Sequence, residues 1–370
     1  MNSQLFSPLA IGPLRLDNRI AVSPMCQYSA NDGSAAPWHL MHLGTLAGSG
    51  AGLVMVEATA VERAGRITHG CLGLYSDANE YALSQTLSFC RSAGAARFGI
   101  QLSHAGRKGS SEAPWKGGQP LSADQDPWLT FSASSSDPAK VRECDADDLA
   151  RIKHAFVQAA ERAVRLGFDL IELHAAHGYL LHQFLSPLSN QRSDQYGGSL
   201  GNRMRFPLEV FEAVREAVPA HVALGARITG TDWLGGGIHV DECIAFATEL
   251  ENRGADYVDV TTGGVAAASI PVGPGYQLEF AAAVKQRVNI PVRAVGMIVT
   301  PQQAEAVIAS GTADSVALGR AFLDNPHWPY EAARVLGATL SYPAQYARAE
   351  IKLWPGSKLK GETAVERSEA

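Results

Sequence analysis

The feature that most constrains the fold of this chain is a repeated unit, in which an amphipathic helix ends at a glycine and leads into a short apolar strand. The clearest unit starts at Asp145, which caps a helix whose apolar residues from 149 to 166 recur at helical spacing. Gly167 follows at the position of a helix C-cap, and residues 168–174 read as the strand. The sequence therefore predicts alternating helices and strands with the strands buried.

Similar strands are expected throughout the chain. Asp241 is expected to cap the helix of a second unit, and Thr300 followed by Pro301 the helix of a third. The other predicted strands are 20–22, 53–56, 98–102, 222–226, 257–260, 292–295 and 315–318. Eight strand–helix units in about 330 residues favour an α/β fold of the (β/α)₈ TIM-barrel type. An open, doubly wound sheet is the alternative, because strand order cannot be read from a sequence.

Two stretches depart from the repeat. Residues 105–144, after the third strand, are rich in Gly, Ser and Pro and are expected to form a lid-like insertion. We expect a single barrel domain over residues 1–348 and a tail over 349–370, disordered from about residue 361.

Composition excludes several classes of protein. The net charge is −6 and Lys and Arg form no run, so neither nucleic acid nor a membrane is expected as a partner. No apolar stretch reaches the roughly 18 residues of a membrane helix, and the first residues do not resemble an export signal. Five scattered cysteines without a C-x-x-C pair argue against disulfides, zinc and iron–sulfur clusters. A reduced cytoplasm is the expected location.

Polar side chains follow the ends of several predicted strands, where a barrel builds its active site. The fourth strand ends in His174, followed by His177 and Tyr179. Two histidines three residues apart can bind a metal, but no third ligand accompanies them, so no metal site is expected. Imidazole N–H groups that hold a substrate oxygen, beside a phenol that delivers a proton, are the favoured interpretation.

Glycines and arginines mark the last strands. Arg227 follows the fifth strand, Gly296 the seventh, and Gly319 with Arg320 the eighth. Barrels often bind phosphate after strands seven and eight, where glycine lets backbone N–H groups approach closely. A flavin-free, phosphate-binding isomerase or aldolase would use the same site, although no Schiff-base Lys or carboxylate base stands out.

Taken together, the motifs resemble the Old Yellow Enzyme family, and most closely its thermophilic-like ene-reductases and xenobiotic reductases. The resemblance extends from residue 5 to about 348. It rests on the segments 23–26 (SPMC), 57–58 (EA), 65–68 (GRIT), 101–108 (QLSHAGRK), 174–179 (HAAHGY), 184–187 (FLSP), 190–192 (NQR), 196–199 (YGGS), 202–203 (NR) and 319–320 (GR).

The resemblance implies a TIM barrel that binds FMN non-covalently and takes electrons from NADPH or NADH. Ser23, Pro24, Met25 and Cys26 would line the flavin, and Ala58 and Gln101 would contact its polar edge. Arg227 would lie at the pyrimidine end, and Gly296, Gly319 and Arg320 would bind the phosphate.

The resemblance also implies a reaction. His174 and His177, with Tyr28 nearby, would bind the carbonyl or nitro oxygen of an activated alkene, and Tyr179 would protonate its α-carbon. Arg348, in a Gln-Tyr-x-Arg segment, would reach the active site of a neighbouring subunit in a homodimer or a dimer of dimers. This chain departs from many relatives in having Val295, rather than an aromatic residue, before Gly296, and in continuing beyond Arg348.

Overall fold

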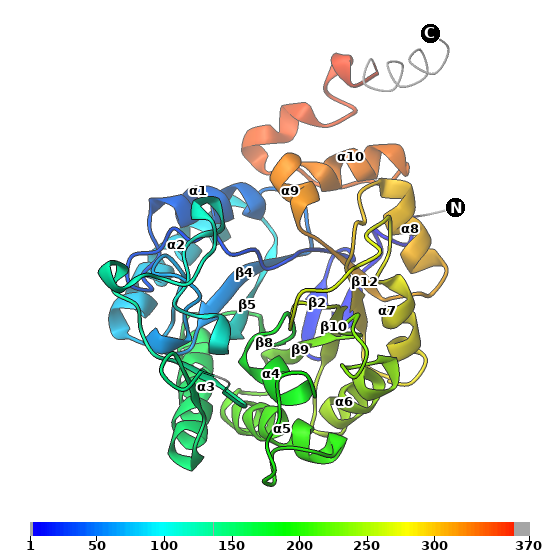
Figure 1. The fold of residues 1–370 in the computed structure, drawn as a ribbon. Coiled ribbons are helices and arrows are strands. Elements are labelled where there is room, and N and C mark those ends of the chain that lie inside the picture. Colours follow the sequence, from blue (N-terminus) through cyan, green and yellow to red (C-terminus); the bar gives the residue numbers. More distant parts are fainter. Residues whose placement is uncertain (1–2, 136, 359–370) are drawn as a thin grey trace.

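The computed structural model describes residues 3–135 and 137–358, and its centre is a closed barrel of eight parallel strands (Figure 1). The strands are β3 (Ile20–Val22), β4 (Leu53–Ala60), β5 (Arg97–Ser103), β8 (Leu170–Ala175), β9 (Ala223–Thr229), β10 (Tyr257–Thr261), β11 (Val292–Ala294) and β12 (Ser315–Leu318). They pair in chain order, and β12 pairs with β3 to close the barrel. The predicted TIM barrel is confirmed, and the open-sheet alternative is wrong.

Helices surround the strands, as the repeated unit predicts (Figure 1). They are α1 (Pro37–Ala47), α2 (Asp77–Ala93), α3 (Ala146–Arg165), α4 (Leu180–Leu185), α5 (Leu200–Ala217), α6 (Val240–Asn252), α7 (Leu278–Lys285), α8 (Pro301–Ala309), α9 (Arg320–Asp324) and α10 (Trp328–Val335). Asp145 and Thr300 cap α3 and α8 as predicted. The prediction of Asp241 as a cap is wrong: His239 is the N-cap of α6, and Asp241 lies in its first turn, where a carboxylate also complements the helix dipole.

The main core lies between the strands and the helices. All six residues of β8 are buried, as are all seven of β9, so these strands face apolar side chains outside and packed side chains inside the barrel. On the helix side, Leu149, Ile152 and Phe156 of α3 are buried. These residues belong to the stripe that the sequence showed, so the predicted spacing identifies the face that packs on the barrel.

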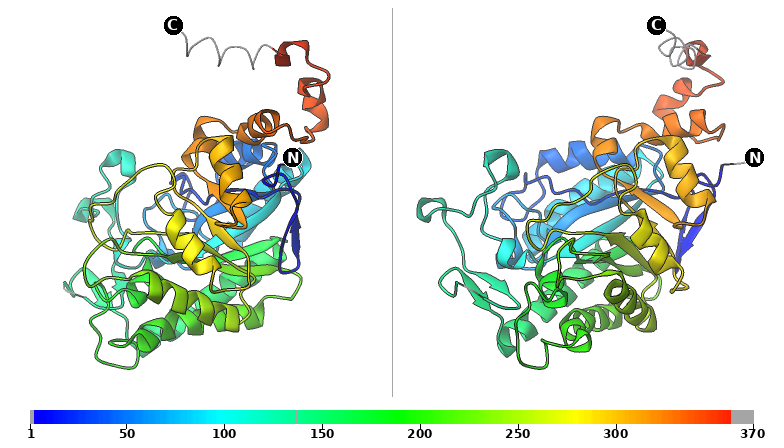
Figure 2. Two further views of the ribbon diagram at one scale, coloured as in Figure 1. Left: turned by 90° about the vertical axis from the view of Figure 1, so that its right-hand side faces the viewer. Right: turned by 45° about the vertical axis from the view of Figure 1, so that its right-hand side comes forward.

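Two small sheets were not predicted. β1 (Leu9–Ile11) and β2 (Leu14–Leu16) form an antiparallel hairpin, and its apolar side chains pack against the inside of the barrel at the amino ends of the strands. β6 (Thr130–Ser132) pairs with β7 (Val141–Glu143) inside the 105–144 insertion. Figure 2 shows the hairpin at one end of the barrel and the insertion at the other. Three-residue strands are too short to show an alternating pattern in a sequence.

The chain continues past α10 into two short 3₁₀ helices, η5 (Ala344–Ala349) and η6 (Pro355–Lys358). This segment projects from the barrel beside α10 (Figures 1 and 2). The expected boundary between residues 348 and 349 falls within η5. The expected disorder from residue 361 lies outside the described residues.

Candidate active site

A cavity of about 630 Å³ opens at the carboxyl ends of β3, β9, β10, β11 and β12. Its lining includes eight of the residues predicted from the sequence, which are Ser23, Pro24, Met25, His177, Arg227, Gly296, Gly319 and Arg320. The folded chain thus brings together side chains that are up to 297 positions apart in the sequence, from Ser23 to Arg320. The expected position of the site, at the carboxyl ends of the strands, agrees with this arrangement.

One corner of this cavity is rich in backbone groups. Gly296 lies two residues past the end of β11, after Val295, and Gly319 is the N-cap of the short helix α9. Arg320, the first residue of α9, is exposed and lines the same cavity. Two glycines and a guanidinium therefore adjoin one cavity, as binding of a phosphate requires.

The opposite part of the cavity contains buried charge. Arg227 lies on β9, and its Nε is 3.3 Å from Oδ1 of Asp259 on β10. Gln101, on β5, is buried and donates from Nε2 to Oε1 of Glu172 at 2.8 Å. Gln101 does not line the cavity itself, and sequence reasoning missed both acidic partners, Glu172 of Gln101 and Asp259 of Arg227.

His174, His177 and Tyr179 form one compact group. The His174 ring centroid lies 5.1 Å from that of His177 and 4.9 Å from that of Tyr179, and both pairs meet edge to face. His177 Nε2 is 3.0 Å from Oγ1 of Thr261, and Lys108 Nζ lies 5.1 Å above the Tyr179 ring. The three predicted side chains are therefore within reach of a single small molecule.

Burial keeps these three groups in their neutral forms. Burial, together with the positive charge of Arg227, holds the pKa of His174 and of His177 well below the usual range. Burial also raises the pKa of Tyr179 well above its usual value. At neutral pH the site therefore offers two neutral imidazoles and a protonated phenol, all of which can donate a hydrogen bond.

The turn between His177 and Tyr179 has a demanding backbone. His177 has φ +58°, and Gly178 has φ +74°, where a Cβ would come within 2.2 Å of the Gly264 carbonyl oxygen. Lys108 Nζ donates to the His177 carbonyl at 2.8 Å, and the Gly178 N–H donates to Nδ1 of His182 at 2.8 Å. These contacts fix the direction in which the two catalytic candidates point.

Cys26 and Tyr28 lie beside this group but outside the cavity lining. Burial raises the pKa of the Cys26 thiol well above its usual value, while the nearby Ala58 N–H and Tyr28 hydroxyl act in the opposite direction. Ala58 is therefore close to Cys26, as the implied flavin contacts require. The Trp115 ring, from the 105–144 insertion, meets the Tyr28 ring edge to face with centroids 5.7 Å apart. The insertion thus reaches the side of the site that Tyr28 forms.

Sequence reasoning missed several residues of the cavity. Tyr276 and Gln277 line it, and Gln277 Oε1 accepts hydrogen bonds from Thr261 and Thr262. These residues come from the long connection after β10, which carries no motif or periodicity. Arg348 is not near this cavity's lining: it lies exposed on η5 and has no hydrogen bond or ion pair within the described residues.

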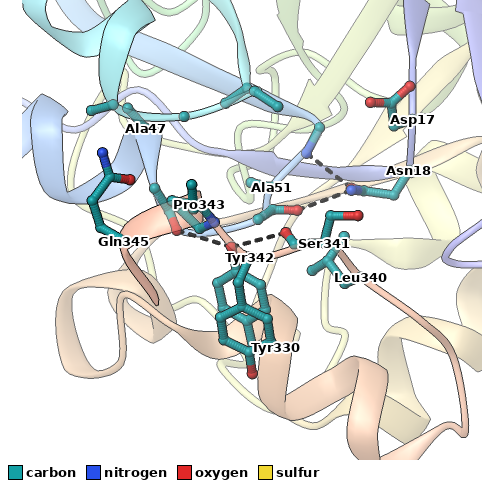
Figure 3. A pocket seen from close by; sticks show the side chains of 18 of the residues that line it. Asp17, Asn18, Ala47, Ala51, Tyr330, Leu340, Ser341, Tyr342, Pro343 and Gln345 are labelled. Atoms are coloured by element: carbon teal, nitrogen blue, oxygen red, sulfur yellow. Dashed lines mark hydrogen bonds between the residues drawn. The ribbon is translucent and has the colours of Figure 1, made fainter. Parts of the chain in front are cut away.

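A second cavity, of about 590 Å³, lies at the other end of the barrel (Figure 3). Asn18, just before β3, donates to the Gly50 carbonyl and accepts from the N–H groups of Ile20 and Gly52. The Tyr330 hydroxyl lies 3.2 Å from the Gly48 carbonyl oxygen and 3.3 Å from that of Ser341, and its one proton can be donated to either. Within the described part of the chain, no buried side-chain atom lining this cavity lacks a hydrogen-bond partner. The polar groups of this cavity therefore hold neighbouring segments of the chain together and leave no buried side-chain group of the described residues for a ligand.

The part of the chain that the structure describes contains no helix of the length and apolarity needed to span a membrane.

Comparison with known proteins identifies the family of this chain. Residues 4–337 match the model of the NADH:flavin oxidoreductase / NADH oxidase family. An NADPH dehydrogenase of Geobacillus thermodenitrificans is 43% identical over 94% of this chain and 99% of its own. Among solved structures, morphinone reductase is 30% identical with a TM-score of 0.76, covering 94% of this chain and 93% of its own. The same enzyme in complex with tetrahydroNAD is 30% identical with a TM-score of 0.73, covering 94% of both chains.

The family match covers most of the chain, the curated relative is matched almost end to end, and the barrel is the fold of the matching solved structures. The chain therefore belongs to the NADH:flavin oxidoreductase / NADH oxidase family, and it is an NAD(P)H-dependent flavin oxidoreductase whose cofactor is FMN.

Proposed function

We propose that this protein is an ene-reductase, which reduces the C=C bond of an alkene activated by a carbonyl or nitro group. The observation that carries the proposal is the group of His174, His177 and Tyr179, with ring centroids about 5 Å apart and all three side chains neutral. Two donors next to a proton source suit a substrate that gains negative charge on an oxygen and a proton on a nearby carbon.

The residues of the cavity fit FMN. Ser23 Oγ in the cavity lining and His174 Nδ1 beside it are buried and lack a hydrogen-bond partner among the described residues, so each is free to meet a polar ligand atom. We assign Ser23, Pro24, Met25 and Cys26 to one side of the flavin ring. The other assignments are Ala58, Gln101 and Arg227 to its polar edge, and Gly296, Gly319 and Arg320 to the phosphate.

Bound FMN supplies a hydride that it has taken from NADPH or NADH. His174 and His177 donate hydrogen bonds to the carbonyl or nitro oxygen of the alkene and stabilise the negative charge that develops there. The Tyr179 hydroxyl gives its proton to the α-carbon while the hydride adds to the β-carbon. We assign Tyr28 to the substrate pocket beside these residues. The protonated Cys26 thiol acts on the cofactor's environment and not as a nucleophile.

An anaerobic titration tests this function. The purified protein should be yellow, and NADPH or NADH should bleach it. 2-Cyclohexenone, a maleimide and a nitro-alkene should each restore the colour and be recovered with the C=C bond saturated. A protein that bleaches but is reoxidised by none of these compounds would contradict the ene-reductase proposal.

We also propose a homodimer or a dimer of dimers, in which Arg348 enters the neighbouring active site. An apolar groove of about 600 Å³ lies next to η5, and Leu40, Met41, Phe89 and Tyr346 line it while exposing 38–54% of their surface. Exposed apolar side chains gathered in one groove are typical of an interface, and a second copy is the partner we propose. A guanidinium over the mouth of the site would help to position the substrate.

Hybrid dimers test the crossing. Chains with Arg348→Ala are combined with chains with Tyr179→Phe. If Arg348 crosses, one site of each hybrid carries both changes and the other is intact, so the hybrid regains about one normal site. If Arg348 serves its own subunit, every site carries one change and no activity is regained.

Finally, we propose a reducing compartment such as the cytoplasm, because all five cysteines are free thiols.

A further inference from the structure

A row of buried side chains, four charged and one an amide, crosses the interior of the barrel behind the cavity. It runs from Gln101 through Glu172, Arg293 and Asp259 to Arg227, and each residue lies on a different strand, β5, β8, β11, β10 and β9. Glu172 and Asp259 are 0% exposed, Arg293 is 1% exposed and Arg227 is 6% exposed. Glu172, Asp259 and Arg293 do not line the cavity. Nothing in the reaction described above uses these three residues.

Direct contacts connect this row of side chains from end to end. Glu172 accepts from Gln101 Nε2 at 2.8 Å and lies 3.5 Å from Arg293 NH1. Arg293 NH1 is 3.7 Å from Oδ2 of Asp259, and Oδ1 of Asp259 is 3.3 Å from Nε of Arg227. The two ends, Gln101 and Arg227, are the residues assigned to the polar edge of FMN.

The strand register explains how these side chains meet. Gln101 is paired with Glu172 between β5 and β8, and Asp259 is paired with both Arg227 and Arg293. Tyr257 completes the set, since its hydroxyl donates to Glu172 at 2.6 Å. The Tyr257 ring occupies the space beside Gly225, where a Cβ would lie 2.4 Å from the ring. Any larger residue at position 225 would displace the ring.

The row contains two carboxyl groups and two guanidinium groups. Burial and the negative charge of Asp259 raise the pKa of Glu172, whereas the positive charges of Arg293 and Arg227 and the hydrogen bond from Tyr257 favour its ionised form. Buried charges are weakly screened, so a change at one member alters the potential at the others. Removal of one charge leaves its partner uncompensated, and the change in potential reaches both ends of the row, Gln101 and Arg227.

We propose that Glu172, Asp259 and Arg293 are positioning residues that set the reduction potential of bound FMN by holding and electrostatically balancing Gln101 and Arg227. The inference rests on the proposed placement of the flavin's polar edge at these two residues. Reduction adds negative charge to the flavin ring. Net positive charge in the row of side chains therefore favours the reduced flavin, and net negative charge favours the oxidised flavin.

The proposal predicts shifts of opposite sign. Asp259→Asn and Glu172→Gln each remove a negative charge and should raise the reduction potential. Arg293→Gln removes a positive charge and should lower the reduction potential. Arg293→Lys keeps the charge, so its ratio of oxidised to reduced flavin at a fixed potential should stay within about twofold of the parent's ratio. We expect each neutralisation to change the ratio of oxidised to reduced flavin at a fixed potential by about tenfold, equivalent to about 30 mV for a two-electron couple.

The measurement is the potential of the FMN-bound protein in anaerobic equilibrium with a reference dye, without any alkene. The ratio of FMN dissociation constants for the oxidised and reduced protein gives the same quantity independently. Asp241→Asn and Arg287→Gln serve as matched controls, because they make the same charge changes at exposed surface positions. Neither control should shift the potential.

Shifts of the same sign in the acidic and basic variants, or no shift in variants that fold and bind FMN, would overturn the proposal. A merely structural role would weaken FMN binding in every variant without opposite shifts. If Arg293→Gln does not fold, Asp259→Asn decides the matter, since it must favour the reduced flavin. Because no alkene is used, a failure of the ene-reductase proposal would leave this result intact.

Discussion

The two ends of the barrel hold cavities of similar size, about 630 Å³ at the carboxyl end and about 590 Å³ at the amino end. They differ in the state of their polar groups. At the carboxyl end Ser23 Oγ is buried without a hydrogen-bond partner among the described residues. At the amino end the buried groups of Asn18 and Tyr330 are all bonded to backbone (Figure 3). Volume alone therefore does not identify the active site; unmet hydrogen-bonding capacity does.

The sharpest way to break this comparison is to remove one hydroxyl from the carboxyl end. Tyr179→Phe should slow reoxidation of the reduced protein by 2-cyclohexenone by about 10²- to 10⁴-fold, since general acid catalysis contributes about that much. Reduction by NADPH should change less than about twofold, because it needs no proton from Tyr179. Stopped-flow absorbance of the flavin measures both steps separately.

Tyr196→Phe makes the same chemical change in a loop remote from the cavity, where the hydroxyl lies 3.4 Å from Glu209, and should alter neither step. Nitro-alkenes should suffer least from Tyr179→Phe, because their carbanion is already stable without prompt protonation. Equal slowing of both half-reactions would remove Tyr179 from the role of proton donor.

A charge at each end gives the next comparison. Arg320→Ala should weaken FMN binding by about 10- to 100-fold, the loss of about one or two charge-assisted hydrogen bonds. Arg287→Ala removes an exposed arginine between α7 and β11, at the amino end, and should leave the affinity unchanged. Fluorescence titration of the apoprotein with FMN measures both constants. Unchanged affinity in Arg320→Ala would show that the phosphate binds elsewhere.

The sequence predicted the barrel strands better than the buried charged residues that they carry. All eight barrel strands were predicted because each is apolar and most follow a helix that ends at a glycine. The positions of His177 and Arg320 at the mouth follow from the barrel alone. The roles of Glu172, Asp259 and Arg293 were missed, although a charge inside an apolar strand is itself a signal. Their pairing depends on strand register, which a single sequence does not reveal.

The amino end should respond in stability and not in catalysis. Asn18→Ala removes three hydrogen bonds from a buried position and should lower the free energy of unfolding by about 2 kcal/mol. The melting temperature at saturating FMN should fall by several degrees. The rate constants of both half-reactions in the folded, FMN-bound variant should equal those of the parent. A changed rate constant would show that the amino end is coupled to the site.

The smallest expected effect concerns protonation of the two histidines at the carboxyl end. Their pKa values lie well below the usual value of about 6.5, which applies to the unfolded chain. Between the folded and unfolded values the unfolded state binds more protons, so stability should fall as pH drops below about 6.5 and should be fully present above it. Each histidine contributes at most about 1.4 kcal/mol per pH unit.

The variant His174→Asn/His177→Asn keeps two donors but has no titrating group, so its melting temperature should depend less on pH between about 5 and 6.5. The parent's reoxidation rate should show no inflection near pH 6.5, because both imidazoles are already neutral there. An inflection near pH 6.5, with activity lost as pH rises, would mean that a charged imidazolium binds the substrate oxygen. The site would then stabilise negative charge with a full positive charge, and the neutral donors assigned to it would be wrong.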